Sequence, residues 1–308
     1  MMAFLLYYNK KLRGWKMKYL GVQLSDGIGI DSRKEVKQET LEVLERWKKV
    51  VDDFDNINSL FQLFISEVAE FNKYMEICST KKIEDLNADE LFYTTLNKHV
   101  INITSNGRLF YEHLSLIIEK QYADFEEEWE KKVSEIFENN FSYRFFNVFR
   151  NYIQHIGFPI TGLNMKYEIE NSEEKLNVEI QFKASVLLKK FKKWKKHVKP
   201  YLIELGDEDI IFSEIMWEYY GNLNQIFFNS LEVFMGKNHS FITKNYVKLV
   251  ELCSGELGEI CIFDIPEIEL LKMKHNDYDN FSGRPITSLG DVNRVVNTLK
   301  EVGIIRKS

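Results

Sequence analysis

Apolar residues recur at intervals of three and four along most of this chain, and that spacing predicts amphipathic helices. We expect helices at residues 35–51, 60–77, 90–119, 125–138, 140–156, 183–199, 207–235, 241–253 and 291–302. The stretch Asp52–Asn58 predicts a break or a kink between the first two helices. Gly107 predicts a bend or a close packing contact within the third.

Two neighbouring segments, 163–170 and 176–182, instead alternate between apolar and polar residues, which predicts a β-hairpin. Further short strands are expected at 17–24, 28–30 and 260–268. The sequence therefore predicts a mainly α protein, a helical bundle with a small β-hairpin and short N-terminal strands.

Changes in pattern divide the chain into three expected segments. Residues 1–30 form an N-terminal extension with short strands, and residues 31–160 form the helical bundle. Residues 161–308 hold the hairpin, a basic helix and a helical C-terminal region, and they either form a separate domain or continue the bundle.

The helix expected at 140–156 has one aromatic and aliphatic face and one polar face. At about 100° per residue, the polar arc carries no carboxylate. It holds Tyr143, Arg144, Asn147, Arg150, Asn151, Gln154 and His155. A solvated face in a chain rich in glutamate and lysine normally mixes both signs of charge. We therefore predict that this face meets an anionic partner.

Composition restricts how such a partner can be bound. The chain has 308 residues and a formal net charge of −6, so a polyanion must bind at a local basic patch rather than in a global basic field. The apolar run at residues 3–8 is too short for a membrane span of about 20 residues or for a signal peptide. We expect a cytoplasmic protein with no membrane partner.

Neither metal ligation nor cofactor binding is indicated. The three cysteines are widely spaced, which predicts buried thiols in a reducing compartment rather than a disulfide framework or a zinc site. The glutamates at 126–128 and 130 lack any Glu-x-x-His partner and are expected to be solvated. There is no phosphate-binding loop or nucleophile elbow. We expect no metal and no cofactor.

Arg150, Asn151 and His155 form the pattern R-N-x-x-x-H on the polar face. An arginine can hold the phosphoryl oxygens with a bidentate fork, and a histidine can exchange protons near neutral pH. Asn151 can orient either group. The flanking polar side chains, Tyr143, Arg144, Asn147 and Gln154, would line the approach of a substrate.

This segment resembles the ribonuclease members of the higher eukaryotes and prokaryotes nucleotide-binding (HEPN) superfamily, which are α-helical bundles with an R-x(4–6)-H motif. The resemblance covers residues 140–159 and the helical setting on both sides. It implies metal-independent cleavage of RNA to 2′,3′-cyclic phosphate and 5′-hydroxyl ends, with Arg150, Asn151 and His155 as catalytic residues. It also implies a toxin or antiviral defence effector, with an antitoxin or another regulatory partner.

Helix geometry separates the two motif residues. Positions five apart differ by about 140° in direction, so Arg150 and His155 lie at opposite edges of the polar face. In the resembled family, two motifs often meet at a dimer interface, which implies a homodimer with a composite active site. Some toxin members have a tyrosine two residues after the histidine. Here that position is Gly157, so modification at that site is not expected.

A second basic feature is the lysine run at 189–199, which surrounds an apolar stripe that includes Phe191 and Trp194. Lys192, Lys193 and Lys196 could follow an RNA backbone. The same run also fits a membrane surface, an acidic partner or a solvated face.

Two alternatives to catalysis remain open. The chain could bind RNA or a nucleotide without turnover, or its polar face could be an interface of a protein-interaction scaffold. In the purely structural interpretation, Arg150 pairs with a carboxylate of the preceding acidic helix and His155 caps its own helix end.

Overall fold

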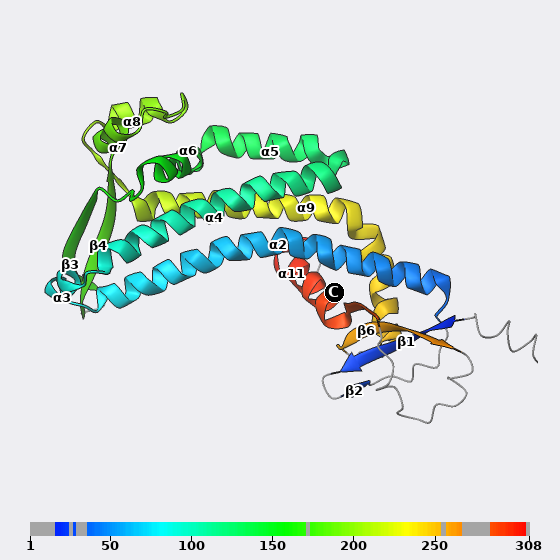
Figure 1. Ribbon diagram of the computed structural model, residues 1–308. Helices are drawn as coiled ribbons and strands as arrows, with labels where there is room; N and C mark the ends of the chain where they lie inside the picture. The colour runs from blue at the N-terminus through cyan, green and yellow to red at the C-terminus, as the bar shows by residue number, and fades with distance from the viewer. Residues whose placement is uncertain are drawn as a thin grey trace, which may run out of the picture. The chain divides into compact units, whose positions relative to one another are not determined.

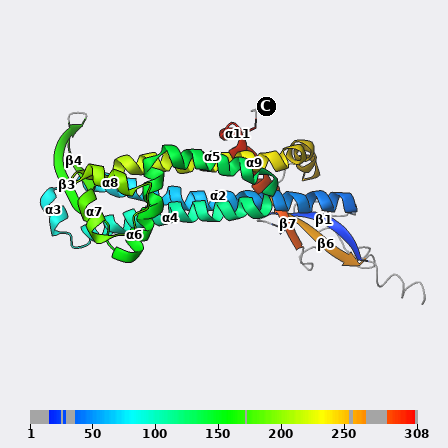
Figure 2. The same cartoon turned by 90° about the horizontal axis from the view of Figure 1, so that it is seen from above.

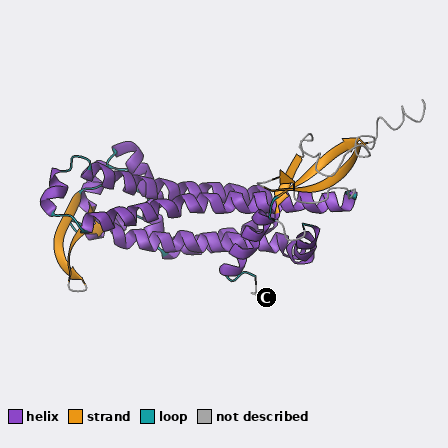
Figure 3. Ribbon diagram, turned by 90° about the horizontal axis from the view of Figure 1, so that it is seen from below, coloured by secondary structure: helices purple, strands orange, loops and turns teal. Residues whose placement is uncertain are grey.

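The structure is a computed structural model that describes residues 16–24, 27–28, 36–170, 173–253, 257–266 and 284–305. It confirms the mainly α prediction, since helices make up most of the described chain (Figures 1 and 3). The chain divides into two compact units, Asn56–Val233 and Met1–Asp55 with Phe234–Ser308. The expected segments end at residues 30 and 160, whereas this division falls inside two long helices, α2 (Gln38–Ser79) and α9 (Phe212–Leu252).

The unit Asn56–Val233 contains the end of α2 and the beginning of α9. Between them lie α3 (Ile83–Ala88), α4 (Phe92–Gln121), η1 (Ala123–Phe125), α5 (Glu126–Asn139), α6 (Phe141–Ile156), β3 (Gly162–Glu170), β4 (Glu173–Lys183), α7 (Ala184–Lys190), α8 (Lys199–Leu205) and β5 (Asp209–Ile211). Helix α6 packs against both α4 and α5 (Figures 1 and 2). Strands β3, β4 and β5 form an antiparallel sheet in that order.

The predicted hairpin is confirmed. Strands β3 and β4 pair over their whole length, with Tyr167 opposite Leu176. Leu176, Val178 and Ile180 are buried, whereas the residues between them are more exposed. This alternation is what a sheet with one packed face requires.

Aromatic rings fill the core of this unit. Phe146 on α6 stacks on Tyr219 of α9 with 4.4 Å between ring centroids, and Phe61 stacks on Phe227 at 4.2 Å. Gly107 lies where α4 meets Tyr219, and a Cβ atom there would stand 2.6 Å from the tyrosine hydroxyl. The glycine therefore marks a close packing contact.

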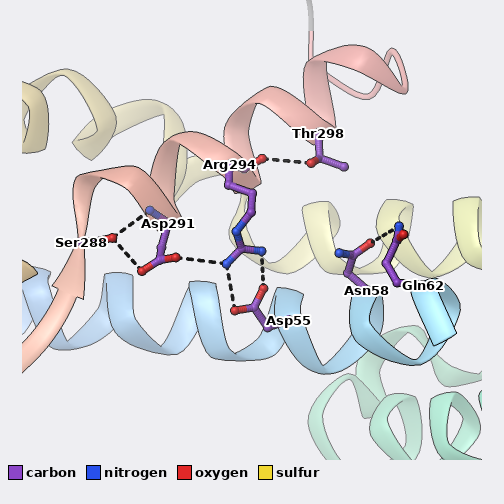
Figure 4. A network of polar contacts seen from close by, with 7 residues as sticks. All are labelled: Asp55, Asn58, Gln62, Ser288, Asp291, Arg294 and Thr298. Carbon is purple, nitrogen blue, oxygen red and sulfur yellow. Dashed lines mark hydrogen bonds and ion pairs between the residues drawn. The ribbon is translucent and has the colours of Figure 1, made fainter. Parts of the chain in front are cut away.

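The other unit holds a four-stranded sheet in the order β2-β1-β6-β7 and the helix α11 (Leu289–Glu301). The strands are β1 (Lys16–Leu24), β2 (Gly27–Ile28), β6 (Glu259–Pro266) and β7 (Arg284–Ser288). The Ser288 hydroxyl caps α11 by accepting the backbone N–H of Asp291. The Arg294 guanidinium donates hydrogen bonds to both carboxylate oxygens of Asp55 and so links α11 to α2 (Figure 4).

Three predicted helix boundaries are wrong. No break occurs at 52–58, because Phe54 and Ile57 are fully buried and their packing outweighs the weak helix propensity of the surrounding Asp and Asn residues. The two helices expected at 207–235 and 241–253 are the single helix α9, which follows the short strand β5. The basic helix expected at 183–199 ends at Lys190.

Beyond Lys190 the chain leaves the helix, with an extended backbone at Phe191 (φ −129°, ψ 122°) and a turn at residues 196–198 before α8. Phe191, Trp194 and Val198 are nevertheless buried, as their spacing predicted. The Trp194 indole N–H donates to the carbonyl of Leu187 at 3.2 Å, which helps to hold the non-helical path. Intervals of three and four therefore identified the buried residues of this segment but not its backbone conformation.

Within the described ranges, no helix is both long and apolar enough to cross a membrane. Cys78, Cys253 and Cys261 all lie in described parts of the chain, where they are buried and form no disulfide.

Candidate functional site

Helix α6 places the motif residues. Its buried side includes Phe145, Phe146 and Phe149, and this packing fixes which positions face outward. Asn140 precedes the helix, but its side-chain amide donates to the Ile136 carbonyl of α5 instead of capping α6. The helix ends at Ile156 and is followed by Gly157, whose φ of 94° favours glycine.

Arg150 and His155 both remain accessible. Arg150 is half-buried and forms no hydrogen bond or ion pair with any residue that the structure describes. The pairing of Arg150 with a carboxylate of the acidic helix α5 is therefore not observed. His155 is exposed in the last turn of α6, where its ring stacks on Phe191 with 6.1 Å between centroids.

One continuous helix carries Arg150 and His155, so the expected separation holds. They lie about 7.5 Å apart along the axis of α6 and about 140° apart around it. A single phosphate can contact both groups only if the arginine stem reaches around the helix or if a second chain supplies one of them.

Arg144 has a structural role in linking α6 to the end of α5. Its guanidinium donates to the carbonyl oxygens of Phe137 and Glu138, which end helix α5. Because these carbonyls have no partner inside their own helix, a cation there satisfies them and complements the helix dipole. Arg144 therefore joins α5 to α6, and its fork is not available to a substrate in this arrangement.

The other polar residues of α6 fall into two groups. Gln154 is exposed near His155. Asn147 and Asn151 instead line a pocket of about 420 Å³ that also includes Tyr143. The prediction that Tyr143 lies on the polar face is wrong, because its side chain is 1% exposed among Tyr111, Phe137 and Tyr219.

This cavity, which we call the Arg108 pocket, contains groups that sequence reasoning missed. Its polar lining comprises Arg108, Ser134, Glu138, Tyr143, Asn147, Asn151, Lys195 and His197, and its apolar lining comprises Tyr111, Val133, Phe137 and Val148. Neither Arg150 nor His155 lines it. Arg108 and His197 had no motif spacing to reveal them, since the fold brings them together from α4 and from the segment after α7.

Burial and neighbouring positive charges shift the pKa values of two side chains that line the Arg108 pocket. Burial lowers the pKa of His197, and the positive charges of Arg144, Lys195 and Lys196 lower it further. Burial also raises the pKa of Tyr143 well above its usual range, so this phenol stays protonated and can donate a hydrogen bond.

The lysine run lies against α6, although it is not a helix. From Phe191 to Tyr201 the chain runs antiparallel to α6. Phe191 stacks on His155 and Trp194 on Phe145, and the Tyr201 ring lies tilted against Phe141 with 3.8 Å between centroids. The side chains of Lys192, Lys193 and Lys196 are exposed on this segment. We call residues 189–199 the lysine segment.

In the described part of the chain, no group of three or more His, Cys, Asp or Glu side chains is arranged to hold a metal ion. No protein-family model, curated protein or solved structure matches this chain. A function must therefore be argued from the residues themselves.

Proposed function

We propose that this chain is an RNA-acting protein of the HEPN type, a metal-independent endoribonuclease that uses Arg150 and His155. The observation that carries the proposal is the contact between His155 and Phe191. Through it, the exposed lysines of the lysine segment lie beside the end of α6 that bears the motif. A polyanion bound along those lysines would pass the histidine.

The chemistry follows from the two residue types. In RNA cleavage, the 2′-oxygen forms a bond to the adjacent phosphorus while the bond from phosphorus to the 5′-oxygen breaks. The 2′-hydroxyl proton leaves and the 5′-oxygen gains one. An imidazole can serve in either proton transfer, and a guanidinium can stabilise the charge on the phosphoryl oxygens. Arg150 suits the second role because no described carboxylate neutralises it.

The test is cleavage of RNA in EDTA by the wild type, Arg150→Ala and His155→Ala, with identification of the product ends. We expect 2′,3′-cyclic phosphate and 5′-hydroxyl ends from the wild type. We expect a loss of at least about a hundredfold in rate from each variant, as for other single catalytic groups. Arg144→Lys serves as a structural control and should keep most of the activity.

A second candidate function is RNA binding without cleavage. It is favoured by the wide angle between Arg150 and His155 on one helix. If intact protein binds RNA but leaves it uncut in EDTA, this candidate replaces the first.

RNA binding itself can be tested on the lysine segment. Replacing Lys192, Lys193 and Lys196 by Gln should weaken RNA binding and reduce its dependence on salt, because fewer counterions are released. The matched control replaces three other exposed lysines of the same unit, Lys98, Lys120 and Lys131. Equal binding by the two triple variants would remove the lysine segment from the RNA site.

A further inference from the structure

The Arg108 pocket contains a guanidinium that is held in place. Arg108 Nε donates to Glu112 Oε1 at 2.8 Å, and its Nη1 donates to Asn147 Oδ1 at 2.8 Å. The guanidinium carbon also lies 5.6 Å from the centre of the Tyr111 ring. Among the described residues, Nη2 has no further hydrogen-bond partner. The guanidinium is thus oriented before any ligand arrives, and one of its donor groups is left unused.

Lys195 supplies a second positive charge at the pocket, and its side chain is exposed. The Tyr143 hydroxyl does not add a donor there, because its oxygen is buried and inaccessible, although Tyr143 is part of the lining. The charged donors available to a ligand are therefore the guanidinium of Arg108 and the ammonium of Lys195.

The charges around the pocket favour an anion. Arg108, Lys195 and the neighbouring Arg144 face two carboxylates, Glu112 and Glu138, and protonation of His197 would add a further positive charge. The remaining walls are apolar or aromatic, including Tyr111, Val133 and Phe137. A ligand that fits therefore combines a compact negative group with a flat apolar body.

We propose that the Arg108 pocket binds a small organic anion, in which a carboxylate or phosphate group contacts Arg108 and Lys195. The planar body of this ligand would lie against Tyr111 and Phe137. The volume of about 420 Å³ is within the range of small-molecule sites. This function goes beyond the proposed RNA chemistry and does not depend on it, since Arg150 and His155 are outside the pocket.

The test is a ligand-observed NMR titration of the full chain with phenyl phosphate, benzoate and neutral benzamide. We expect saturable binding of at least one anion at roughly millimolar concentration and none of benzamide. The anion that binds more tightly identifies the phosphate or the carboxylate as the preferred group. Failure of both anions to saturate, or equal binding of benzamide, would overturn the proposal.

Variants then assign the binding groups. Arg108→Gln and Lys195→Gln should each weaken binding at least about fivefold, as expected from loss of a charged hydrogen bond. Lys195 is exposed, so its variant keeps the test valid if Arg108→Gln does not fold. Wild-type affinity in the Lys195→Gln variant and in any folded Arg108 variant would contradict the assignment.

Discussion

At the scale of single residues, two arginines of α6, Arg144 and Arg150, differ in their hydrogen bonding although their sequence surroundings are similar. Arg144 is used by the C-terminal carbonyls of α5, whereas Arg150 has no partner among the described residues. Both follow an aromatic residue, Tyr143 or Phe149, and both lie on the polar arc predicted from the sequence, so the local pattern does not show which one has a partner. The difference arises from the turn that connects α5 to α6, which brings only Arg144 to the helix end.

The burial of Tyr152 was likewise not predictable from its position in the motif. As a tyrosine inside the motif, it could have been an accessible target for modification. The structure buries it completely, and burial raises its pKa to about 12. It belongs to the aromatic packing of α6 rather than to its polar face.

Asp53 offers a residue-scale test through pH. This carboxylate on α2 is 5% exposed, and its Oδ2 has no hydrogen-bond partner among the residues that the structure describes. Burial raises its pKa above the ordinary value of 3.8, although Lys49, Lys237 and Arg46 oppose the rise. The contribution of Asp53 to stability is therefore fully present below the unfolded pKa and is lost as the pH rises through the folded pKa.

Asp53→Asn removes this titration. Compared with the wild type, the variant should gain stability as the pH rises from the ordinary carboxyl pKa through the raised pKa of folded Asp53. Urea unfolding at several pH values measures the difference. A difference that is constant across this range, or that grows toward acid, would show that the carboxylate is not destabilised by burial.

At the scale of elements, most helices and the hairpin could be predicted because their core faces follow a regular period. The segment 52–58 and the lysine segment could not, for opposite reasons. In the first, two buried residues, Phe54 and Ile57, continue a helix through polar neighbours. In the second, aromatic contacts to α6 bury residues at helical spacing on a non-helical path between α7 and α8.

Gly107 tests the packing of α4 against α9. Gly107→Ala would place a methyl group 2.6 Å from the Tyr219 hydroxyl and 2.9 Å from Leu223 Cδ1, both on fully buried side chains. We expect a loss of about 1–3 kcal/mol from overpacking. Gly221→Ala on α9 is the control, because no atom lies within 4 Å, and it should gain about 0.5–1 kcal/mol. Equal effects in thermal unfolding would contradict the contact.

At the scale of the whole molecule, the candidate site was only partly predictable. The sequence indicated α6 and its basic face, since these depend on periodicity within one helix. It could not indicate the Arg108 pocket, which is assembled from α4, α5, α6 and the lysine segment. Sites formed by one element can be deduced from spacing, whereas sites formed by several elements require the fold.

The proposed ribonuclease needs Arg150 and His155 to act together on one RNA phosphate. Because the two residues are separated on α6, a homodimer is the arrangement that would bring them together. In a twofold dimer, each site would take the arginine of one chain and the histidine of the other. A mixture of Arg150→Ala and His155→Ala chains would then contain heterodimers with one intact site.

The most direct measurement is RNA cleavage in EDTA by the two variants, separately and after the chains are mixed in equal amounts and allowed to exchange. We predict that either variant alone loses at least about a hundredfold in rate. The mixture should recover about a quarter of the wild-type activity, because half of its dimers are mixed and each of these has one working site of two. Cleavage near the wild-type rate by either single variant, or no recovery on mixing while the wild type cuts RNA, would contradict the composite site.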